Sequence, residues 1–278
     1  MIAAARRGPE LIADVEESAA ATRSLHAWWL GQSGFLLSYE GERLLLDPYL
    51  SDSLTAKYAA TEMPHERMTE RVVEPRDLRG IVGVLASHHH TDHLDGETLR
   101  PLFAANPDAV LVVPAPHREL AMERTGLAAE RVLDLDDGGV VDLGAFQVEG
   151  VPAAHERIEH DADGRLVYMG YVVSVGGFRV YHAGDTIPYD GMAARVGPVD
   201  LALLPINGRD PRRGVAGNMD GAEAAALAAA LPARVAVPCH FEMFAFNTAD
   251  PARFLAACDD LGVRTARLRA GGRLTLEP

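Results

Sequence analysis

Four histidines and two aspartates occupy eight consecutive positions, from His88 to Asp95. Within this stretch the pattern H-x-H-x-D-H contains His88, His90, Asp92 and His93. Imidazole nitrogens and carboxylate oxygens are good ligands for Zn²⁺, Mn²⁺ and iron. One ion rarely takes four ligands from so short a stretch, because the chain cannot wrap around it that tightly. We therefore expect two ions, with His88 and His90 facing one, and Asp92 and His93 facing the other.

Further ligands must come from distant parts of the chain. His155, Asp185 and His240 each follow a predicted strand, and a carboxylate such as Asp185 can bridge two ions. The expected ligand sets are His88, His90, His155 and Asp185 for one ion, and Asp92, His93, Asp185 and His240 for the other. Two ions about 3.5–4 Å apart would lower the pKa of a shared water to near neutrality. Asp92, which would orient the resulting hydroxide, and Asp185 are the expected catalytic carboxylates. Taken singly, each distant residue could instead be a helix cap, a turn residue or a core histidine.

The remaining six histidines are not expected to bind metal. His89 is predicted to point away from its neighbours and to support the cluster or the local fold. His182 either orients a ligand or fills the sheet. The other four are predicted to lie at the surface: His26, His65, His117 and His160.

Asp47 ends the apolar run LLLD. A carboxylate there can accept the second ring N–H of a ligand histidine and fix its tautomer. The alternative is that Asp47 begins a turn before Pro48.

The stretch INGRDPRRG concentrates arginines in an acidic chain. Arg209, with Arg212 or Arg213, is predicted to grip an anionic substrate, because guanidinium groups bind carboxylates and phosphates in a bidentate manner. A solvated charged loop is the alternative. Asn207 and Asn218 are expected either to orient the substrate or to cap local backbone.

The elements that position these residues are predicted to alternate between strands and helices. Strand patterns cover residues 81–86, 109–114, 131–135, 140–155, 165–185, 200–205 and 234–240, and helix patterns cover 9–21, 117–124, 221–231 and 250–262. Asp220 and Glu223 resemble a capping box at the start of one helix. This order predicts a layered α/β fold with its polar clusters at strand ends.

Composition narrows the classes of partner. The chain has 278 residues, 26 basic and 40 acidic, and a net charge of −14. Such a chain repels phosphate backbones, so neither nucleic acid nor an anionic membrane is an expected partner. Two cysteines give no disulfide scaffold, which favours the cytoplasm. The expected partner is a small anionic substrate, and a homo-oligomer is left open.

HHHTDHLD, followed by single His, Asp and His residues, resembles the metallo-β-lactamase-fold hydrolases. The resemblance implies an αββα four-layer sandwich over residues 28–278, preceded by a helical extension at 1–27. It implies the same metal ligands as above. WWLGQSGFLL, LLLDPYL, YHAGDT and LPINGRDPRRGVAGNMDGAEAA are most similar to the L-ascorbate-6-phosphate lactonase-like subfamily.

The expected reaction is therefore metal-dependent hydrolysis. The expected substrate is a lactone, and the lactone of a phosphorylated sugar acid is one candidate. No G-x-S-x-G motif supports a serine nucleophile. Zn²⁺ and Mn²⁺ both suit the ligands, and iron fits them too. Three other functions remain as competing hypotheses: a phosphodiesterase, a redox di-iron protein and a metal-binding protein without enzymatic activity. A redox di-iron protein of this kind would carry an acidic residue at His90.

Overall fold

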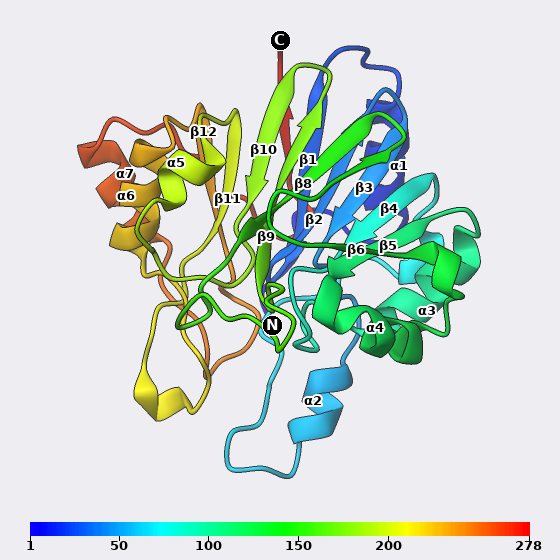
Figure 1. Cartoon of the computed structure of the whole chain (residues 1–278). Coiled ribbons are helices and arrows are strands. Elements are labelled where there is room, and N and C mark those ends of the chain that lie inside the picture. The colour runs from blue at the N-terminus through cyan, green and yellow to red at the C-terminus, as the bar shows by residue number, and fades with distance from the viewer.

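The computed structural model describes residues 1–278 and contains two β-sheets packed face to face, with helices on both outer sides (Figure 1). The seven-stranded sheet has the order β13-β1-β2-β3-β4-β5-β6, and the six-stranded sheet has the order β12-β11-β10-β9-β8-β7. This confirms the predicted αββα sandwich.

The strands of the first sheet are β1 (Leu25–Gly31), β2 (Gly34–Tyr39), β3 (Glu42–Leu46), β4 (Ile81–Leu85), β5 (Val110–Pro114), β6 (Val132–Leu135) and β13 (Arg273–Leu276). Those of the second sheet are β7 (Val140–Leu143), β8 (Phe146–Pro152), β9 (Met169–Val175), β10 (Phe178–His182), β11 (Leu201–Pro205) and β12 (Val235–Cys239). The α-helices are α1 (Pro9–Ser18), α2 (Ser53–Tyr58), α3 (Gly96–Ala105), α4 (Arg118–Thr125), α5 (Met192–Val196), α6 (Gly221–Ala230) and α7 (Ala252–Asp260). Short 3₁₀ turns lie at Pro75–Asp77, Ala115–His117, Ala129–Arg131 and Pro211–Arg213.

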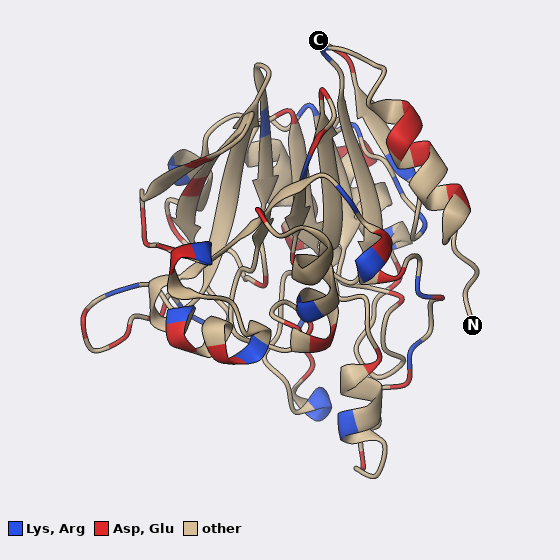
Figure 2. Cartoon of the chain, turned by 90° about the vertical axis from the view of Figure 1, so that its right-hand side faces the viewer, with Lys and Arg blue, Asp and Glu red and all other residues tan.

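The leucine run of β3 shows why the sequence forms a sandwich. Leu44, Leu45 and Leu46 are all fully buried. Successive side chains of a strand point to opposite faces, so both faces of β3 must be covered. Leu44 and Leu46 belong to the core between the two sheets, whereas Leu45 belongs to the core under the helices. Charged residues accordingly colour mainly the helices and loops, and the strands are largely uncharged (Figure 2).

The N-terminal helix α1 belongs to the outer layer of the first sheet. Leu11 and Val15 are buried in the same core cluster as Trp28 of β1, and Trp28 Nε1 donates a 2.7 Å hydrogen bond to Asp14. The helix ends at Ser18, three residues before the predicted end. β1 starts at Leu25, so it spans the predicted boundary between residues 27 and 28, and that division stays a prediction.

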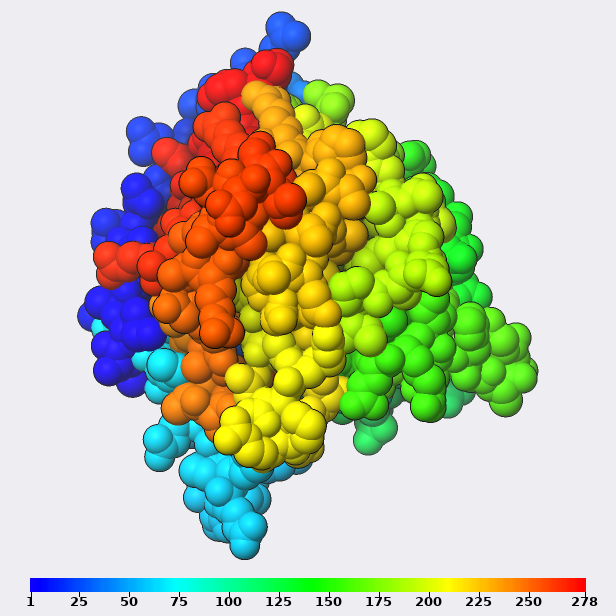
Figure 3. All heavy atoms as spheres, turned by 90° about the vertical axis from the view of Figure 1, so that its left-hand side faces the viewer, coloured from blue at the N-terminus to red at the C-terminus, as the bar shows by residue number.

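Strand direction brings the polar loops to one edge. β3 to β6 are mutually parallel, as are β10 to β12, and β8 runs in the same direction as β10 because each is antiparallel to β9. The carboxyl ends of these strands therefore share the edge from which α2 projects (Figure 1). The space-filling view shows residues 51–65 projecting at this end, below the loop around residues 206–216 (Figure 3). No helix of the structure has the length and apolarity needed to cross a membrane.

Candidate metal centre

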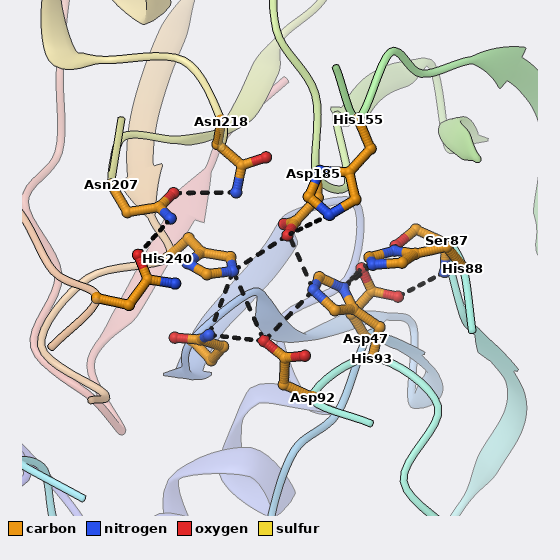
Figure 4. Close-up of polar contacts among 12 residues, drawn as sticks. Asp47, Ser87, His88, Asp92, His93, His155, Asp185, Asn207, Asn218 and His240 are labelled. Atoms are coloured by element: carbon orange, nitrogen blue, oxygen red, sulfur yellow. Dashed lines mark hydrogen bonds and ion pairs between the residues drawn. The ribbon is translucent and has the colours of Figure 1, made fainter. Parts of the chain in front are cut away.

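Five strand ends supply the polar residues at this edge. Asp47 follows β3, the segment His88–His93 follows β4, His155 follows β8, Asp185 follows β10 and His240 follows β12. Figure 4 shows side chains from these loops converging on one point. The structure thus brings together all seven residues predicted as metal ligands.

Three groups of side chains have ligand atoms within 4.8 Å of one another: His88, His90 and His155; Asp92, His93 and His240; and His88, His93 and Asp185. The first two groups match the histidine-rich and the mixed ligand sets expected from the sequence. The third group takes one residue from each of them, together with Asp185. Asp185 therefore lies between the two sets.

Asp185 contacts histidines on both sides. Its Oδ1 lies 3.4 Å from His93 Nε2, and its Oδ2 lies 3.2 Å from His240 Nε2 and 3.9 Å from His155 Nε2. The side chain is almost fully buried. Burial alone would raise the pKa of Asp185, but His240 and His93 hold it well below its usual range. A carboxylate that is ionised and shared between histidines is suited to bridging cations.

Asp92 is held by a residue that the sequence analysis did not single out. Gln32, in the turn between β1 and β2, is buried, and its Nε2 donates a 2.8 Å hydrogen bond to Asp92 Oδ2. The same nitrogen lies 3.2 Å from His240 Nε2. Asp92 Oδ2 also lies 3.6 Å from His240 Nε2 and 3.7 Å from His93 Nε2. Gln32 therefore fixes the direction of this carboxylate.

Asp47 lies behind the cluster and makes the contact predicted for it. Its Oδ2 lies 2.7 Å from His93 Nδ1 and 2.8 Å from His182 Nε2. The backbone N–H and the hydroxyl of Ser87 each donate a 2.7 Å hydrogen bond to the same carboxylate. His182 thus belongs to the group that orients His93, which was one of its two predicted roles. Ser87 was not predicted, although it directly precedes His88.

The backbone is strained where it presents three of these residues. Gln32, Asp47 and His240 have φ values of 52°, 41° and 59°, in the left-handed region that non-glycine residues seldom adopt. Such conformations persist only where surrounding contacts enforce them, and they concentrate at functional sites. Here each one turns a side chain toward the cluster directly after a strand.

The first group of histidines is held in its neutral form. Burial, followed by the neighbouring His93 and His90, lowers the pKa of His88 well below its ordinary value. Burial lowers the pKa of His90 to about 4. Neutral imidazoles have a free lone pair at neutral pH, which is what a metal ion requires.

The unpaired atoms of the cluster fit a metal. His88 Nε2, His93 Nε2 and Asp185 Oδ1 are buried and have no hydrogen-bond partner. A buried polar atom without a partner costs about 1–3 kcal/mol. Divalent cations coordinated at these atoms would remove that cost, so the residues present fit metal binding.

A cavity of about 290 Å³ opens above the cluster, lined among others by His90, Asp92, His155, Asp185 and His240. Asn247 also lines it and connects to a chain of amides. Asn207 Nδ2 donates to Asn247 Oδ1, and Asn218 Nδ2 donates to Asn207 Oδ1, both at 3.0 Å. Asn207 and Asn218 therefore lie buried beside the cluster (Figure 4). The cap of α6 is Asp220, in the predicted capping box with Glu223, so Asn218 does not cap this helix.

The structure does not bring the three arginines of the INGRDPRRG stretch (the arginine loop, residues 206–214) to the cluster. Arg209 pairs with Glu223 of α6 and donates to the Asn218 carbonyl, and Arg212 is exposed and pairs with Asp210. Arg213 donates to the Asn207 and Thr248 carbonyls and to Asn247 Oδ1. These arginines line a separate hollow, so their geometry gives no support to an anion clamp over the metal centre.

The prediction that four further histidines lie at the surface is correct only for one of them. His160 is exposed, as expected, but His26 and His117 are buried and His65 is half-buried. His26 Nδ1 pairs with Thr275 on β13, and His117 Nε2 with the Val167 carbonyl. His89 belongs to none of the three ligand groups, and its ring centroid lies 4.8 Å from that of His117.

An α/β sandwich with histidines and aspartates gathered at one sheet edge defines a protein of metallo-β-lactamase fold. Igni18, a metallo hydrolase from Ignicoccus hospitalis, aligns with a TM-score of 0.66 at 22% identity, covering 92% of this chain and 99% of that one. The metallo-beta-lactamase fold protein YhfI from Bacillus subtilis aligns with a TM-score of 0.65 at 14% identity, covering 91% and 99%.

Sequence comparison identifies the family. Residues 42–241 match the beta-lactamase superfamily domain. A protein of Opitutus terrae named "UPF0173 metal-dependent hydrolase" is 35% identical over 234 residues, which is 82% of this chain and 89% of that protein. The chain therefore belongs to the β-lactamase superfamily and, within it, to the UPF0173 family.

Proposed function

We propose that this chain is a metal-dependent hydrolase with a dinuclear centre and that it opens a lactone. The observation that carries the proposal is the position of Asp185, between His88, His90 and His155 on one side and Asp92, His93 and His240 on the other. Relatives that are named metal-dependent hydrolases support the reaction class. The sequence likeness to the ascorbate-phosphate lactonase group supports the lactone.

Seven residues would hold the metals. His88, His90 and His155 suit one divalent ion, Asp92, His93 and His240 suit the second, and Asp185 suits both. Zn²⁺ and Mn²⁺ both accept this mixture of nitrogen and oxygen ligands, as does iron. Two such ions supply Lewis acidity and lower the pKa of a coordinated water towards neutrality.

The residues of the chain handle the proton and the geometry. In ester hydrolysis the water oxygen bonds to the carbonyl carbon, the ring C–O bond breaks, and one proton passes from the water to the departing alkoxide. Asp92 faces the cavity and is oriented by Gln32, so its carboxylate is placed to accept this proton and to deliver it. In a lactone the alkoxide stays attached to the acyl group, and the product is a single hydroxy acid.

The test compares metal-free protein with protein reloaded with Zn²⁺ or Mn²⁺. Reloading is expected to restore hydrolysis of a simple lactone, with two ions bound per chain by mass spectrometry. Bis-p-nitrophenyl phosphate serves as the parallel substrate, because faster turnover of this compound would favour a phosphodiesterase of the same fold. No hydrolysis of either compound by the reloaded protein would favour a metal-binding protein without this activity.

Single substitutions test the two ligand sets separately. His90→Ala removes a ligand from the histidine set and His240→Ala removes one from the mixed set, and each is expected to abolish most activity. His160→Ala is the matched control, because this histidine is exposed and lies outside the ligand groups. If His90→Ala and His240→Ala both stay fully active, the dinuclear proposal fails.

A further inference from the structure

The cavity above the metal centre has a second wall of a different character. Besides the ligand residues, the lining includes Leu54 and Tyr58 from the α2 segment, and Phe244 and Phe246 from the loop after β12, and these four residues form an aromatic wall. Leu54 and Phe244 are buried in a small apolar cluster, and Tyr58 and Phe246 pack against it while remaining half-exposed. The half-exposed rings therefore leave apolar surface for a ligand.

Aromatic stacking makes this wall a defined surface. The ring of His65 stacks on Tyr58, with centroids 4.1 Å apart and an interplanar angle of 17°. It also lies 4.4 Å from the ring of Phe246. The segment that carries His65 pairs with the loop after β12. The Met68 N–H donates to the Met243 carbonyl at 2.7 Å, and the backbones of Arg67 and Phe244 form an antiparallel β-bridge.

The wall is fixed relative to the metal loop by Asp95. The hydroxyls of Ser51 and Ser53, at the start of α2, donate to Asp95 at 2.6 and 3.0 Å. Asp95 lies two residues after His93 and also caps α3. The distance between the aromatic wall and the ligand residues is thereby set by hydrogen bonds within the chain.

A cation lies beside the aromatic wall. Lys57 is the only lysine of the 278 residues, it lines the cavity, and its side chain is exposed. Its Nζ lies 5.1 Å from the centroid of Tyr58 and makes no ion pair, in a chain with a net charge of −14. Arg124 lines the same cavity and likewise makes no ion pair, because its guanidinium donates to the backbone carbonyls of His89 and Leu94. An unpaired ammonium group next to an apolar wall is suited to a ligand that has both an anionic and an apolar part.

We propose that the substrate is a small lactone that carries an aromatic ring and an anionic substituent. The ring packs on Tyr58 and Phe246, the anion pairs with Lys57, and the lactone carbonyl faces the ligand residues. This proposal rests on the proposed lactonase function and specifies its substrate. The cavity volume of about 290 Å³ lies just below the usual range for ligand sites, which begins at about 300 Å³, and therefore favours a small ligand such as one fused ring system.

The kinetic test uses three lactones: δ-valerolactone, dihydrocoumarin and a dihydrocoumarin that carries a carboxylate on its benzene ring. We expect kcat/KM to rise in that order. Lys57→Met is expected to lower the preference for the carboxylated over the uncharged dihydrocoumarin about three- to fivefold, the upper part of the range for an exposed charge pair. Lys57→Arg should restore most of this preference. Phe246→Ala should reduce the preference for dihydrocoumarin over δ-valerolactone about tenfold.

Arg264→Gln is the matched control, because Arg264 is exposed and does not line the cavity. It should leave both preferences unchanged. Equal preferences in Lys57→Met and in the unsubstituted protein would overturn the role of Lys57, provided that lactones are hydrolysed at all.

A binding test makes the outcome independent of hydrolysis. Reductive ¹³C-methylation tags only Lys57 and the amino terminus of the chain, and Lys57→Met identifies the lysine signal by its loss. In Zn²⁺-loaded protein, benzenesulfonate is expected to shift the Lys57 signal at concentrations at which methanesulfonate and methyl phenyl sulfone do not. The first comparison compound lacks the ring and the second lacks the charge.

The two tests separate the proposals. A Lys57 shift specific to benzenesulfonate in a protein that hydrolyses no lactone would support the subsite and refute the lactonase function. Equal shifts with methanesulfonate and benzenesulfonate would overturn the aromatic part of the subsite. No shift with any of the three compounds would overturn the subsite as a whole.

Discussion

Asp47 Oδ2 lies 2.7 Å from Nδ1 of His93, whereas Nε2 of the same ring faces Asp92 and Asp185 in the cluster. Since the carboxylate accepts a hydrogen bond from Nδ1–H, the proton that the neutral ring retains is held at Nδ1, and Nε2 is the nitrogen that would lose its proton and bind a metal. His182 and Ser87 hold the carboxylate in place. One fully buried aspartate thus sets the orientation and the tautomer of a residue that belongs to two of the three ligand groups.

Asp47→Asn tests this relationship with little change in shape. Asparagine has nearly the same volume and tolerates the left-handed conformation that Asp47 adopts, with φ at 41°. The amide lacks the charge that His93 and His182 require, so the affinity for Zn²⁺ is expected to fall about 10- to 100-fold. Competition with a chromophoric chelator measures this affinity. Asp142→Asn, at an exposed position on β7, is the control, and equal affinities in the two variants would show that Asp47 does not tune the metal site.

Gln32→Leu tests the orientation of Asp92. Leucine has a similar size but cannot donate the 2.8 Å hydrogen bond to Asp92 Oδ2. Hydrogen bonds to charged groups contribute about 1.5–3 kcal/mol, so kcat is expected to fall at least about tenfold while the metal content stays close to that of the unsubstituted protein. Gln147→Leu, which removes an exposed amide on β8, should leave kcat unchanged. A parallel loss of metal and activity in Gln32→Leu would instead place Gln32 among the residues that retain the ions.

The convergence of the seven candidate ligand residues could be predicted from the sequence because their signals are local. His88, His90, Asp92 and His93 form one short motif, and His155, Asp185 and His240 each follow an apolar strand pattern. Parallel strands then carry these residues to a common edge.

Residues whose role depends on tertiary contacts were missed or misplaced. Gln32 reaches Asp92 only because a turn with positive φ points it inward, and no periodicity reveals that conformation. Arg209 has its acidic partner on α6, and His117 is buried through its contact with the Val167 carbonyl. Helix α2, which supplies Lys57, has only six residues, too few for a hydrophobic periodicity to predict a helix.

Metal binding is expected to release protons and to strengthen with rising pH. Burial alone would lower the pKa of His93, but Asp185, Asp47 and Asp92 raise it well above its ordinary value in the metal-free chain. Asp185 likewise raises the pKa of His240 against the effect of burial. Both rings are therefore protonated at lower pH and must lose a proton when they bind a metal, so affinity should rise about tenfold per pH unit for each proton released.

The stability of the metal-free protein should change in the opposite direction. A raised histidine pKa stabilises the folded state fully below the unfolded value of about 6.5, and this contribution is lost as pH rises through the folded pKa.

Calorimetric titration of the metal-free protein with Zn²⁺ in two buffers of different ionisation enthalpy counts the protons released. An affinity that does not vary between about pH 6 and pH 8 would contradict the expected protonation of His93 and His240.

Arg209→Ala distinguishes the arginine loop from the cavity as the place where an anionic substrate is held. In the structure the Arg209 guanidinium pairs with Glu223, and both side chains are partly exposed, at 43% and 30%. We expect the KM for a carboxylated lactone to change less than about twofold, because this group does not line the cavity above the cluster. The free energy of unfolding in urea should fall by less than about 1 kcal/mol, as for other exposed ion pairs. A tenfold rise in KM at unchanged stability would mean that Arg209 leaves Glu223 to bind the substrate, and the anion clamp expected from the sequence would then replace Lys57 as the main contact for the negative charge.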